Sequence, residues 1–508
     1  MTAPVASPSA TGRYEAVIGI EIHVQLRTRS KMFCGCSTDF QAAPPNSHTC
    51  PICLGMPGTL PVANRLAVEH VLATGLALEA EIVPVTRWDR KNYFYPDLPK
   101  GYQISQYDLP LTQNGRLTFD TSEGPFTVGI RRAHLEEDTA RLLHMTGDSG
   151  DRASLVDFNR SGVALMEIVT EPDLRTAEQA RRYAEELRLL LLTIGASEAA
   201  LESGQMRVEA NISLRPIGAQ AFGTRVEVKN MNSFRSVERA IGHEIERQAG
   251  VLSNGGDVIQ ETRGWDENRA ATYTMRLKED SQDYRYFPEP DLPPLKADPA
   301  WLDEIRARQP ELPAARRARY RAELGLSAYD ANVIVGDLKA TRVFEGALAA
   351  ESALPAKRVA NWVTGEYLRL AKGSDAIDAL EPAELGRLLR LVDEGTLSGT
   401  SAKEVFARIF AGERTAAVVE ELGLAQISDG GALETAVDEV LAANPAAVED
   451  IRAGKAQAIG FLVGQVMKQT RGRANAAMVR ELIRSRLDAA PPAATAPRRP
   501  KGTPEASG

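Results

Sequence analysis

Residues 17–26 read Val-Ile-Gly-Ile-Glu-Ile-His-Val-Gln-Leu. Apolar side chains occupy positions 18, 20, 22, 24 and 26, and this period of two predicts a β-strand with one face in a core. The opposite face carries Glu21 and His23, which a strand holds about 6 to 7 Å apart on one side of a sheet. These two side chains could converge on one ion or substrate, or they could simply face solvent.

Three further segments, 126–138, 206–215 and 224–229, carry Glu, His, Asn or Arg at non-core positions. Glu209 and Glu227 are among these residues. Hard oxygen ligands with one imidazole suit Mg²⁺ or Mn²⁺ better than a structural zinc, and the neighbouring cations suit phosphate. The strands together therefore favour a site that holds a divalent metal and phosphate. The alternative is the solvated face of a half-exposed antiparallel sheet.

Two common catalytic motifs are absent from the sequence. There is no Gly-x-x-x-x-Gly-Lys-[Ser/Thr] loop, so any ATP would have to bind on the predicted sheet. There is also no Gly-x-Ser-x-Gly motif, and we expect the cysteines to bind metal, so the chain has no evident nucleophile for hydrolysing an amide.

The four cysteines of the chain are Cys34, Cys36, Cys50 and Cys53. The second pair has the Cys-x-x-Cys spacing of zinc knuckles, and the first pair is one residue tighter. The sequence therefore predicts a structural Cys₄ zinc site that fixes the loop after the first strand. A redox Cys-x-x-Cys pair would leave the other two cysteines unexplained.

Residues 87–97 and 100–106 interleave basic and aromatic side chains, as a single-stranded RNA end or a nucleotide base requires, although local packing also explains such clusters. The net charge of -8 argues against a generally basic nucleic-acid binder, so RNA contact would need a local patch.

With 508 residues, the chain is long enough for roughly three domains. Mixed strand and helix patterns give way to helical ones after about residue 296, so we expect an α+β fold followed by two all-helical domains. The predicted segments are a disordered leader (1–13), the α+β domain (14–295), helical domains (296–408 and 409–487) and a disordered tail (488–508). A Thr-x-x-Gln capping box at Thr176 predicts the start of one helix.

The first residues do not form a signal peptide, and no apolar run approaches the roughly 18 residues of a membrane helix. We therefore expect a cytoplasmic protein with no membrane contact.

Seven segments together carry a family resemblance that extends from about residue 14 to 487. The segments are 17–23, 89–97, 102–106, 134–138, 207–216, 283–291 and 460–465. In this order they closely resemble the B subunit of the aspartyl/glutamyl-tRNA amidotransferase. The resemblance implies a cradle domain of the glutamine synthetase and guanido kinase fold type with an antiparallel sheet, then a helical domain and a small helical tail domain that touches tRNA.

The resemblance also implies a reaction. Members of that family use ATP to phosphorylate the side-chain carboxylate of Glu-tRNA(Gln), and often of Asp-tRNA(Asn). Ammonia from the glutaminase subunit of the same enzyme then displaces the phosphate, and a small third subunit ties the other two together. Two other functions remain open: a non-catalytic tRNA-binding scaffold, and a free-standing small-molecule ligase.

The resemblance implies the same five side chains as catalytic residues and magnesium ligands. They are Glu21, His23, Glu137, Glu209 and Glu227. Spacing leaves Glu136 open as an alternative to its neighbour. The zinc cysteines match only some members of the family, so zinc is a structural option within it.

Overall fold

The structure is a computed structural model. It describes residues 12–146, 152–277, 284–374, 378–424, 430–453, 455, 457–470, 474 and 476–489. Most of the predicted leader and tail, residues 1–11 and 490–508, lies outside this description, as does Asp283 of the segment 283–291. The chain divides into two compact units, Met1–Ala318 and Arg319–Gly508.

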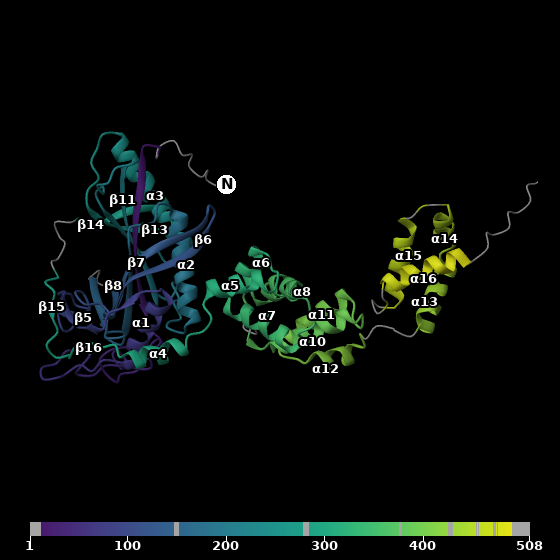
Figure 1. Ribbon diagram of the computed structural model, residues 1–508, viewed down its shortest axis with the longest axis horizontal. Helices are drawn as coiled ribbons and strands as arrows, with labels where there is room; N and C mark the ends of the chain where they lie inside the picture. The colour runs from purple at the N-terminus through teal and green to yellow at the C-terminus, as the bar shows by residue number, and fades with distance from the viewer. Residues whose placement is uncertain are drawn as a thin grey trace, which may run out of the picture. The chain divides into compact units, whose positions relative to one another are not determined.

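A nine-stranded sheet dominates the described part of the first unit (Figure 1). Its strands, in spatial order, are β14 (Ala271–Leu277), β13 (Glu261–Asp266), β12 (Val226–Lys229), β11 (Met206–Pro216), β1 (Tyr14–Gln25), β10 (Ala164–Thr170), β7 (Gly124–Glu137), β6 (Thr112–Thr121) and β2 (Glu81–Ile82). All neighbours are antiparallel except β12 and β13. The predicted α+β class is confirmed, with the opening stretch as the central strand.

The apolar face of β1 lies in the core, as its period of two predicts. Ile18, Ile20, Ile22 and Val24 are all fully or almost fully buried. Three helices, α1 (Arg65–Ala77), α2 (Ala177–Thr193) and α3 (Phe234–Ser253), contact the sheet strands, and side chains of all three join the same core. The side chains that alternate with this core therefore lie on the opposite face of the sheet.

Helix α2 begins where the sequence predicts. The Thr176 side chain accepts a hydrogen bond from the backbone N–H of Gln179, and the Gln179 side chain accepts one from the backbone N–H of Thr176. This reciprocal capping box satisfies two N–H groups that the first helical turn would otherwise leave unpaired.

Replacing Ile22 with alanine is expected to destabilise the first unit by about 2–5 kcal/mol, because it opens a cavity beneath the central strand. Urea denaturation followed by circular dichroism measures the loss. The matched control is Ile217→Ala, just past the end of β11, where the side chain is exposed and the change should stay within about 0.5 kcal/mol. Equal losses in both variants would contradict the assigned core.

Two small sheets bring distant segments of the chain together. Strand β4 (Asp89–Asn92) pairs with β5 (Tyr102–Ser105) and with β15 (Phe287–Pro288). Strand β3 (Val85–Thr86) pairs with β16 (Leu295–Lys296). Three of the segments that carry the family resemblance thus meet in the first of these sheets. A separate hairpin consists of β8 (Arg141–Thr146) and β9 (Arg152–Asp157).

The first compact unit extends past strand β16 to Ala318. Helix α4 (Pro299–Ala307) contacts α1, and Ile305 joins the core of the unit. Arg317, in α5 (Pro313–Ala322), pairs with Glu186 of α2 at 2.6 Å. These contacts attach the first helices after the sheet to the sheet domain.

The described residues of the second unit form helices and loops and no strand. Its helices after α5 are α6 (Ala328–Val335), α7 (Leu338–Ala350), α8 (Ala356–Trp362), the π-helix η2 (Val363–Tyr367), α9 (Leu368–Ala371), α10 (Pro382–Asp393), α11 (Gly399–Phe410), α12 (Thr415–Leu422), α13 (Gly430–Ala443), α14 (Pro445–Arg452), α15 (Gln457–Gln469) and α16 (Ala476–Ala489). Residues of α13, α15 and α16 form a hydrophobic core of their own. None of the helices described is long and apolar enough to cross a membrane.

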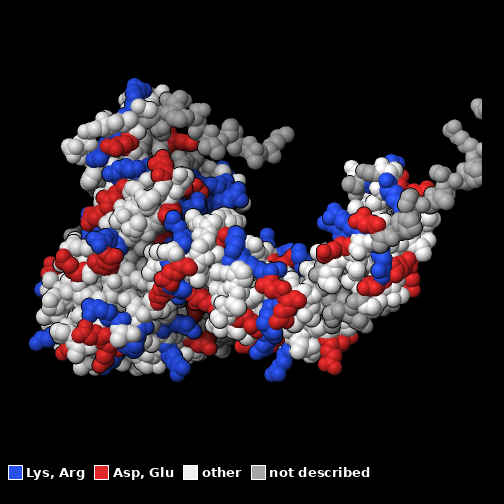
Figure 2. Space-filling model, turned by 45° about the vertical axis from the view of Figure 1, so that its right-hand side comes forward, with Lys and Arg blue, Asp and Glu red and all other residues white. Residues whose placement is uncertain are grey.

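Acidic and basic side chains are interspersed on the face of the molecule drawn in Figure 2. That mixed surface agrees with the modest net charge of -8.

Candidate functional site

Cross-strand register gathers polar side chains on the face of the sheet opposite the helices. Glu21 lies opposite Glu209, and His23 lies between Glu167 on β10 and Arg207 on β11. Because residues directly opposite each other in an antiparallel pair have Cβ atoms about 5 Å apart, this register brings carboxylates of separate strands within reach of one ion.

The first acidic group consists of Glu21, Glu209 and Glu227. Each offers a carboxylate oxygen, and these oxygens lie within 4.8 Å of one another. Burial and the charge of Glu167 raise the pKa of Glu21, because both oppose its ionised form. The Lys229 ammonium lies 2.7 Å from Glu209 and 3.3 Å from Glu227. This ammonium offsets part of the negative charge of the three carboxylates.

The second acidic group consists of His23, Glu136 and Glu167. The His23 Nε2 atom lies 3.5 Å from a carboxylate oxygen of each glutamate. Burial lowers the pKa of His23, but the hydrogen bond and charge of Glu167 and the charge of Glu136 outweigh it and raise that pKa to about 9. Both glutamates are almost fully buried, so two carboxylates and an imidazole share a site that water barely reaches.

Four of the five predicted metal ligands therefore lie in these two groups, and Glu137 does not. The Glu137 side chain lies on the opposite side of β7, where it accepts hydrogen bonds from Lys100 Nζ and from the backbone N–H of Ile104. Its neighbour Glu136 occupies the acidic group instead.

Glu167 was not among the residues predicted from the sequence. It is the one charged residue of the strand Ala-Leu-Met-Glu-Ile-Val-Thr, residues 164–170. A carboxylate in a mostly apolar, buried strand requires a cation or a hydrogen-bond donor nearby. This pattern could have identified Glu167 as a candidate site residue.

Both acidic groups line one cavity of about 630 Å³. Its wall also carries cationic and aromatic side chains: Lys91, Arg132, Arg207, Arg225, Lys229, Arg276, Tyr93, Tyr284 and Tyr286. Lys91 and Tyr93 come from the basic and aromatic segment 87–97, whereas Phe94 of that segment is largely exposed. The cavity therefore combines acidic groups that suit hard cations with cations that suit phosphate.

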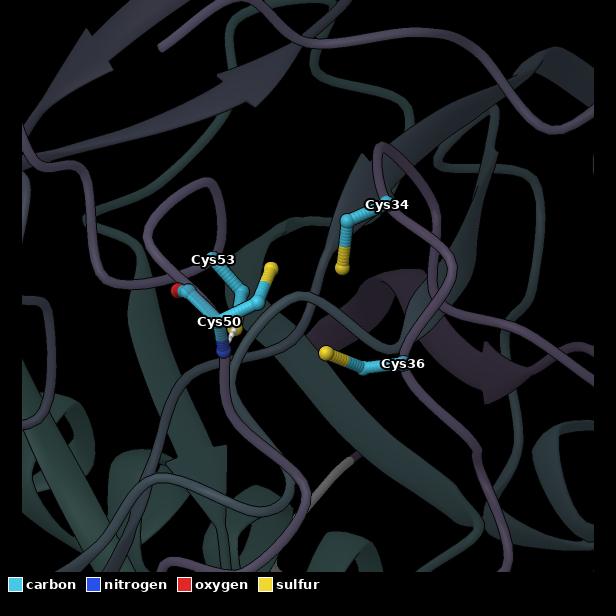
Figure 3. A group of neighbouring side chains, drawn as sticks. All are labelled: Cys34, Cys36, Cys50 and Cys53. Carbon is cyan, nitrogen blue, oxygen red and sulfur yellow. Dashed lines mark hydrogen bonds between the residues drawn. The ribbon is translucent and has the colours of Figure 1, made fainter.

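The four cysteines converge, as their spacing predicts (Figure 3). Their Sγ atoms all lie within 4.8 Å of one another, and a tetrahedral zinc with bonds of about 2.3 Å requires sulfur separations of about 3.8 Å. The Sγ atom of Cys53 accepts a hydrogen bond from the backbone N–H of Cys50 at 3.1 Å. The group thus fits a structural metal with only small adjustments.

A buried lysine adjoins the cysteines. Lys31 is fully buried, and its Nζ lies 3.7 Å from the Sγ of Cys53. The hydrogen bond with Cys34 lowers the pKa of the Cys53 thiol to about 4, against the effect of burial, and Lys31 adds to the shift. A thiolate at this position is consistent with metal binding.

The comparisons with known proteins first define the class. Residues 16–303, which contain both acidic groups and all four cysteines, match the GatB/GatE catalytic domain. Residues 342–487 match the GatB domain. The chain is thus an enzyme subunit with a catalytic domain of this type.

The relatives give the particular family. The chain is 50% identical over 478 residues to a protein of Carboxydothermus hydrogenoformans and 52% identical over 478 residues to one of Moorella thermoacetica. These alignments cover 93% of this chain and 99% and 100% of the relatives. Both relatives are described as the B subunit of aspartyl/glutamyl-tRNA(Asn/Gln) amidotransferase, and the chain belongs to this family.

Proposed function

We propose that this chain activates the side-chain carboxylate of Glu-tRNA(Gln), of Asp-tRNA(Asn) or of both by phosphorylation with ATP. Ammonia from a glutaminase subunit then converts the activated group to an amide, and a small third subunit completes the complex. The observation that carries the proposal is the cavity in which two acidic groups face a set of lysine and arginine side chains. We propose that the chain acts in the cytoplasm, as expected from its sequence.

The reaction requires no protein nucleophile. A carboxylate oxygen of the substrate forms a bond to the γ-phosphorus of ATP, while the bond between that phosphorus and the bridging oxygen of ADP breaks. Ammonia then forms a bond to the acyl carbon, the acyl carbon–oxygen bond breaks, and phosphate leaves with loss of a proton from nitrogen. The protein has to position the reactants and offset their charge. Acidic groups that hold metal ions can do this together with lysine and arginine side chains that contact phosphate.

The two acidic groups fit Mg²⁺ by their donor chemistry. The residues that would hold it are Glu21, Glu209 and Glu227 in the first group and His23, Glu136 and Glu167 in the second. Bound Mg²⁺ would offset the phosphate charge and polarise the acyl oxygen. Two observations support the fit: the charges of Glu209 and Glu227 still raise the pKa of Glu21 although Lys229 pairs with both, and the buried Nδ1 of His23 has no hydrogen-bond partner within the described structure.

The four cysteines would hold a structural zinc, separate from the reaction. These cysteines lie in the loop between β1 and α1. In the same loop, the backbone N–H of Met32 donates a hydrogen bond to the backbone carbonyl of Gly162, which lies next to β10. Zinc at this point would stabilise the wall of the sheet domain beside the cavity.

Reconstitution with the partner subunits tests the function. We expect the complex to form Gln-tRNA from Glu-tRNA(Gln), or Asn-tRNA from Asp-tRNA(Asn), only when ATP and glutamine are both present. Assays with each mischarged tRNA, with and without ATP, measure this and identify the working substrate. Full activity without ATP, or activity on free glutamate in place of aminoacyl-tRNA, would contradict the proposal.

A further inference from the structure

Arg207 lies beside both acidic groups. Across the β1–β11 pair it is opposite His23 of the second group, and Glu209 of the first group lies two residues further along the same strand. Residues two apart on a strand share a face at a spacing of about 6 to 7 Å. Arg207 therefore shares the face of the sheet that carries both groups, and it lines the cavity wall.

One side of the Arg207 guanidinium is held by Asp138, which is almost fully buried. Its two terminal nitrogens lie 3.4 and 3.3 Å from Asp138 Oδ1. The Asp138 carboxylate also accepts hydrogen bonds from the side chain of Gln25 and the backbone N–H of Thr139, both at 2.9 Å. Burial opposes the charge, but Arg207 and Arg160 keep the pKa of Asp138 below its usual value. Asp138 is thus a fixed anion that orients Arg207.

Arg160, the other cation next to Asp138, has a different environment. Its Nε and one terminal nitrogen donate to the backbone carbonyls of Thr139 and Ala140, both at 2.9 Å. Arg160 therefore stabilises the backbone that follows Asp138. In the residues that the structure describes, Arg207 donates hydrogen bonds to Asp138 alone, and 37% of its side chain is exposed. The remaining N–H groups of its guanidinium are therefore available to a ligand in the cavity.

The acidic groups form their ion pairs with cations other than Arg207, although its charge also lowers the pKa of Glu209. Lys229 pairs with Glu209 and Glu227, and Lys91 lies 3.6 Å from Glu136. Asp138, in contrast, belongs to neither group. Arg207 thus offers guanidinium N–H groups to an oxyanion that binds in the cavity beside both groups.

We propose that Arg207 is a catalytic residue that binds the phosphoryl group during its transfer to the substrate carboxylate, and that Asp138 is its positioning residue. The inference rests on the proposed function and deepens it. While the bond from phosphorus to the ADP oxygen breaks and the bond to the carboxylate oxygen forms, Arg207 donates N–H groups to phosphoryl oxygens and keeps its own proton. A planar guanidinium matches two such oxygens at once, which an ammonium cannot do.

Substitution of Arg207 in the reconstituted complex tests the proposal. Arg207→Gln should lower kcat for ATP-dependent amidation by about 10²-fold, the usual cost of one lost electrostatic contact to a transition state. Arg207→Lys keeps the charge but loses the fork, so its kcat should fall between those of the wild type and Arg207→Gln. Added guanidinium ion should partly restore the activity of Arg207→Ala, a rescue that a purely structural role would not give.

The matched control is Arg215→Gln, on the same strand and the same face. Arg215 pairs with Glu15 at 2.7 Å and does not line the cavity, so its kcat should stay within about twofold of wild type. If the wild-type complex shows no ATP-dependent amidation, the proposed function fails. If the wild type is active and both Arg207→Gln and Arg207→Lys retain its kcat, only the role of Arg207 is overturned.

Asp138→Asn tests the positioning role separately. Asparagine keeps the shape but loses the charge that orients the guanidinium, so kcat should fall about tenfold with little change in KM for ATP, since misplacement of a catalytic group slows the chemical step. An unchanged kcat would overturn the role of Asp138. Asp138→Glu, which restores the anion, should recover part of the loss.

Discussion

Replacement of Glu21 with glutamine is expected to abolish ATP-dependent amidation, with a loss in kcat of about 10³-fold or more. Glutamine has nearly the same shape but no charge, so the first acidic group loses one of its three carboxylates. One lost electrostatic contact to a transition state costs about 10² to 10³, and loss of a charged ligand weakens cation binding in addition. The assay is amide formation on mischarged tRNA by the reconstituted complex.

The matched control is Glu15→Gln, on the same strand and the same face. Glu15 pairs with Arg215 at 2.7 Å and does not line the cavity, so its loss should leave amidation near the wild-type rate. Gel filtration confirms that each variant still assembles with its partner subunits. Normal amidation by an assembled Glu21→Gln complex would refute the assignment of the first acidic group to the reaction.

Amidation and tRNA binding, measured together in such variants, separate catalysis from a scaffold role. A non-catalytic tRNA-binding protein would support amidation after the carboxylates of both groups are neutralised, and its affinity for tRNA would fall with salt. A catalytic protein would retain tRNA binding in Glu21→Gln but lose the reaction. The mixed charge on the face shown in Figure 2 gives the scaffold alternative no broad basic surface there.

The fold class and the central strand could be predicted because their signals are local. A strand with five alternating apolar residues must bury one face, and the same alternation fixes which side of the sheet Glu21 and His23 occupy. Thr176 and Gln179 marked a helix start for a similar reason, since a capping box involves only neighbouring residues. The order of the strands depends on long-range pairing and could not be obtained from these patterns.

The choice between Glu136 and Glu137 was harder because polar residues occupy both faces at the end of β7. Leu135 shows which face of this strand lies in the core. It is fully buried in the core, and Glu137 shares its side of the strand, whereas Glu136 shares the side of His134 and faces the cavity. The family resemblance favoured Glu137 as the metal ligand, but Glu136 is the residue that lies in the second acidic group.

Replacement of Cys53 with serine is expected to reduce the zinc content of the purified chain from about one ion to almost none. A serine hydroxyl is a poor zinc ligand compared with a thiolate, and even loss of an outer partner typically costs 10- to 100-fold in metal affinity. The substitution should also lower the melting temperature. Cys53 is buried, and the buried Lys31 would lose the sulfur that lies 3.7 Å from its Nζ atom.

Elemental analysis of protein purified without added metal measures the zinc, and a thermal scan measures the stability. The matched control is Ser37→Ala, which lies one residue from Cys36 on the exposed side of the same loop and offers no sulfur. Its zinc content should equal that of the wild type. Treatment of the wild type with a chelator should reproduce the lower melting temperature of Cys53→Ser, because both remove the same link between the loop and the sheet domain. Wild-type protein without zinc would refute the metal site, and zinc retained by Cys53→Ser would show that the remaining three thiolates suffice to hold it.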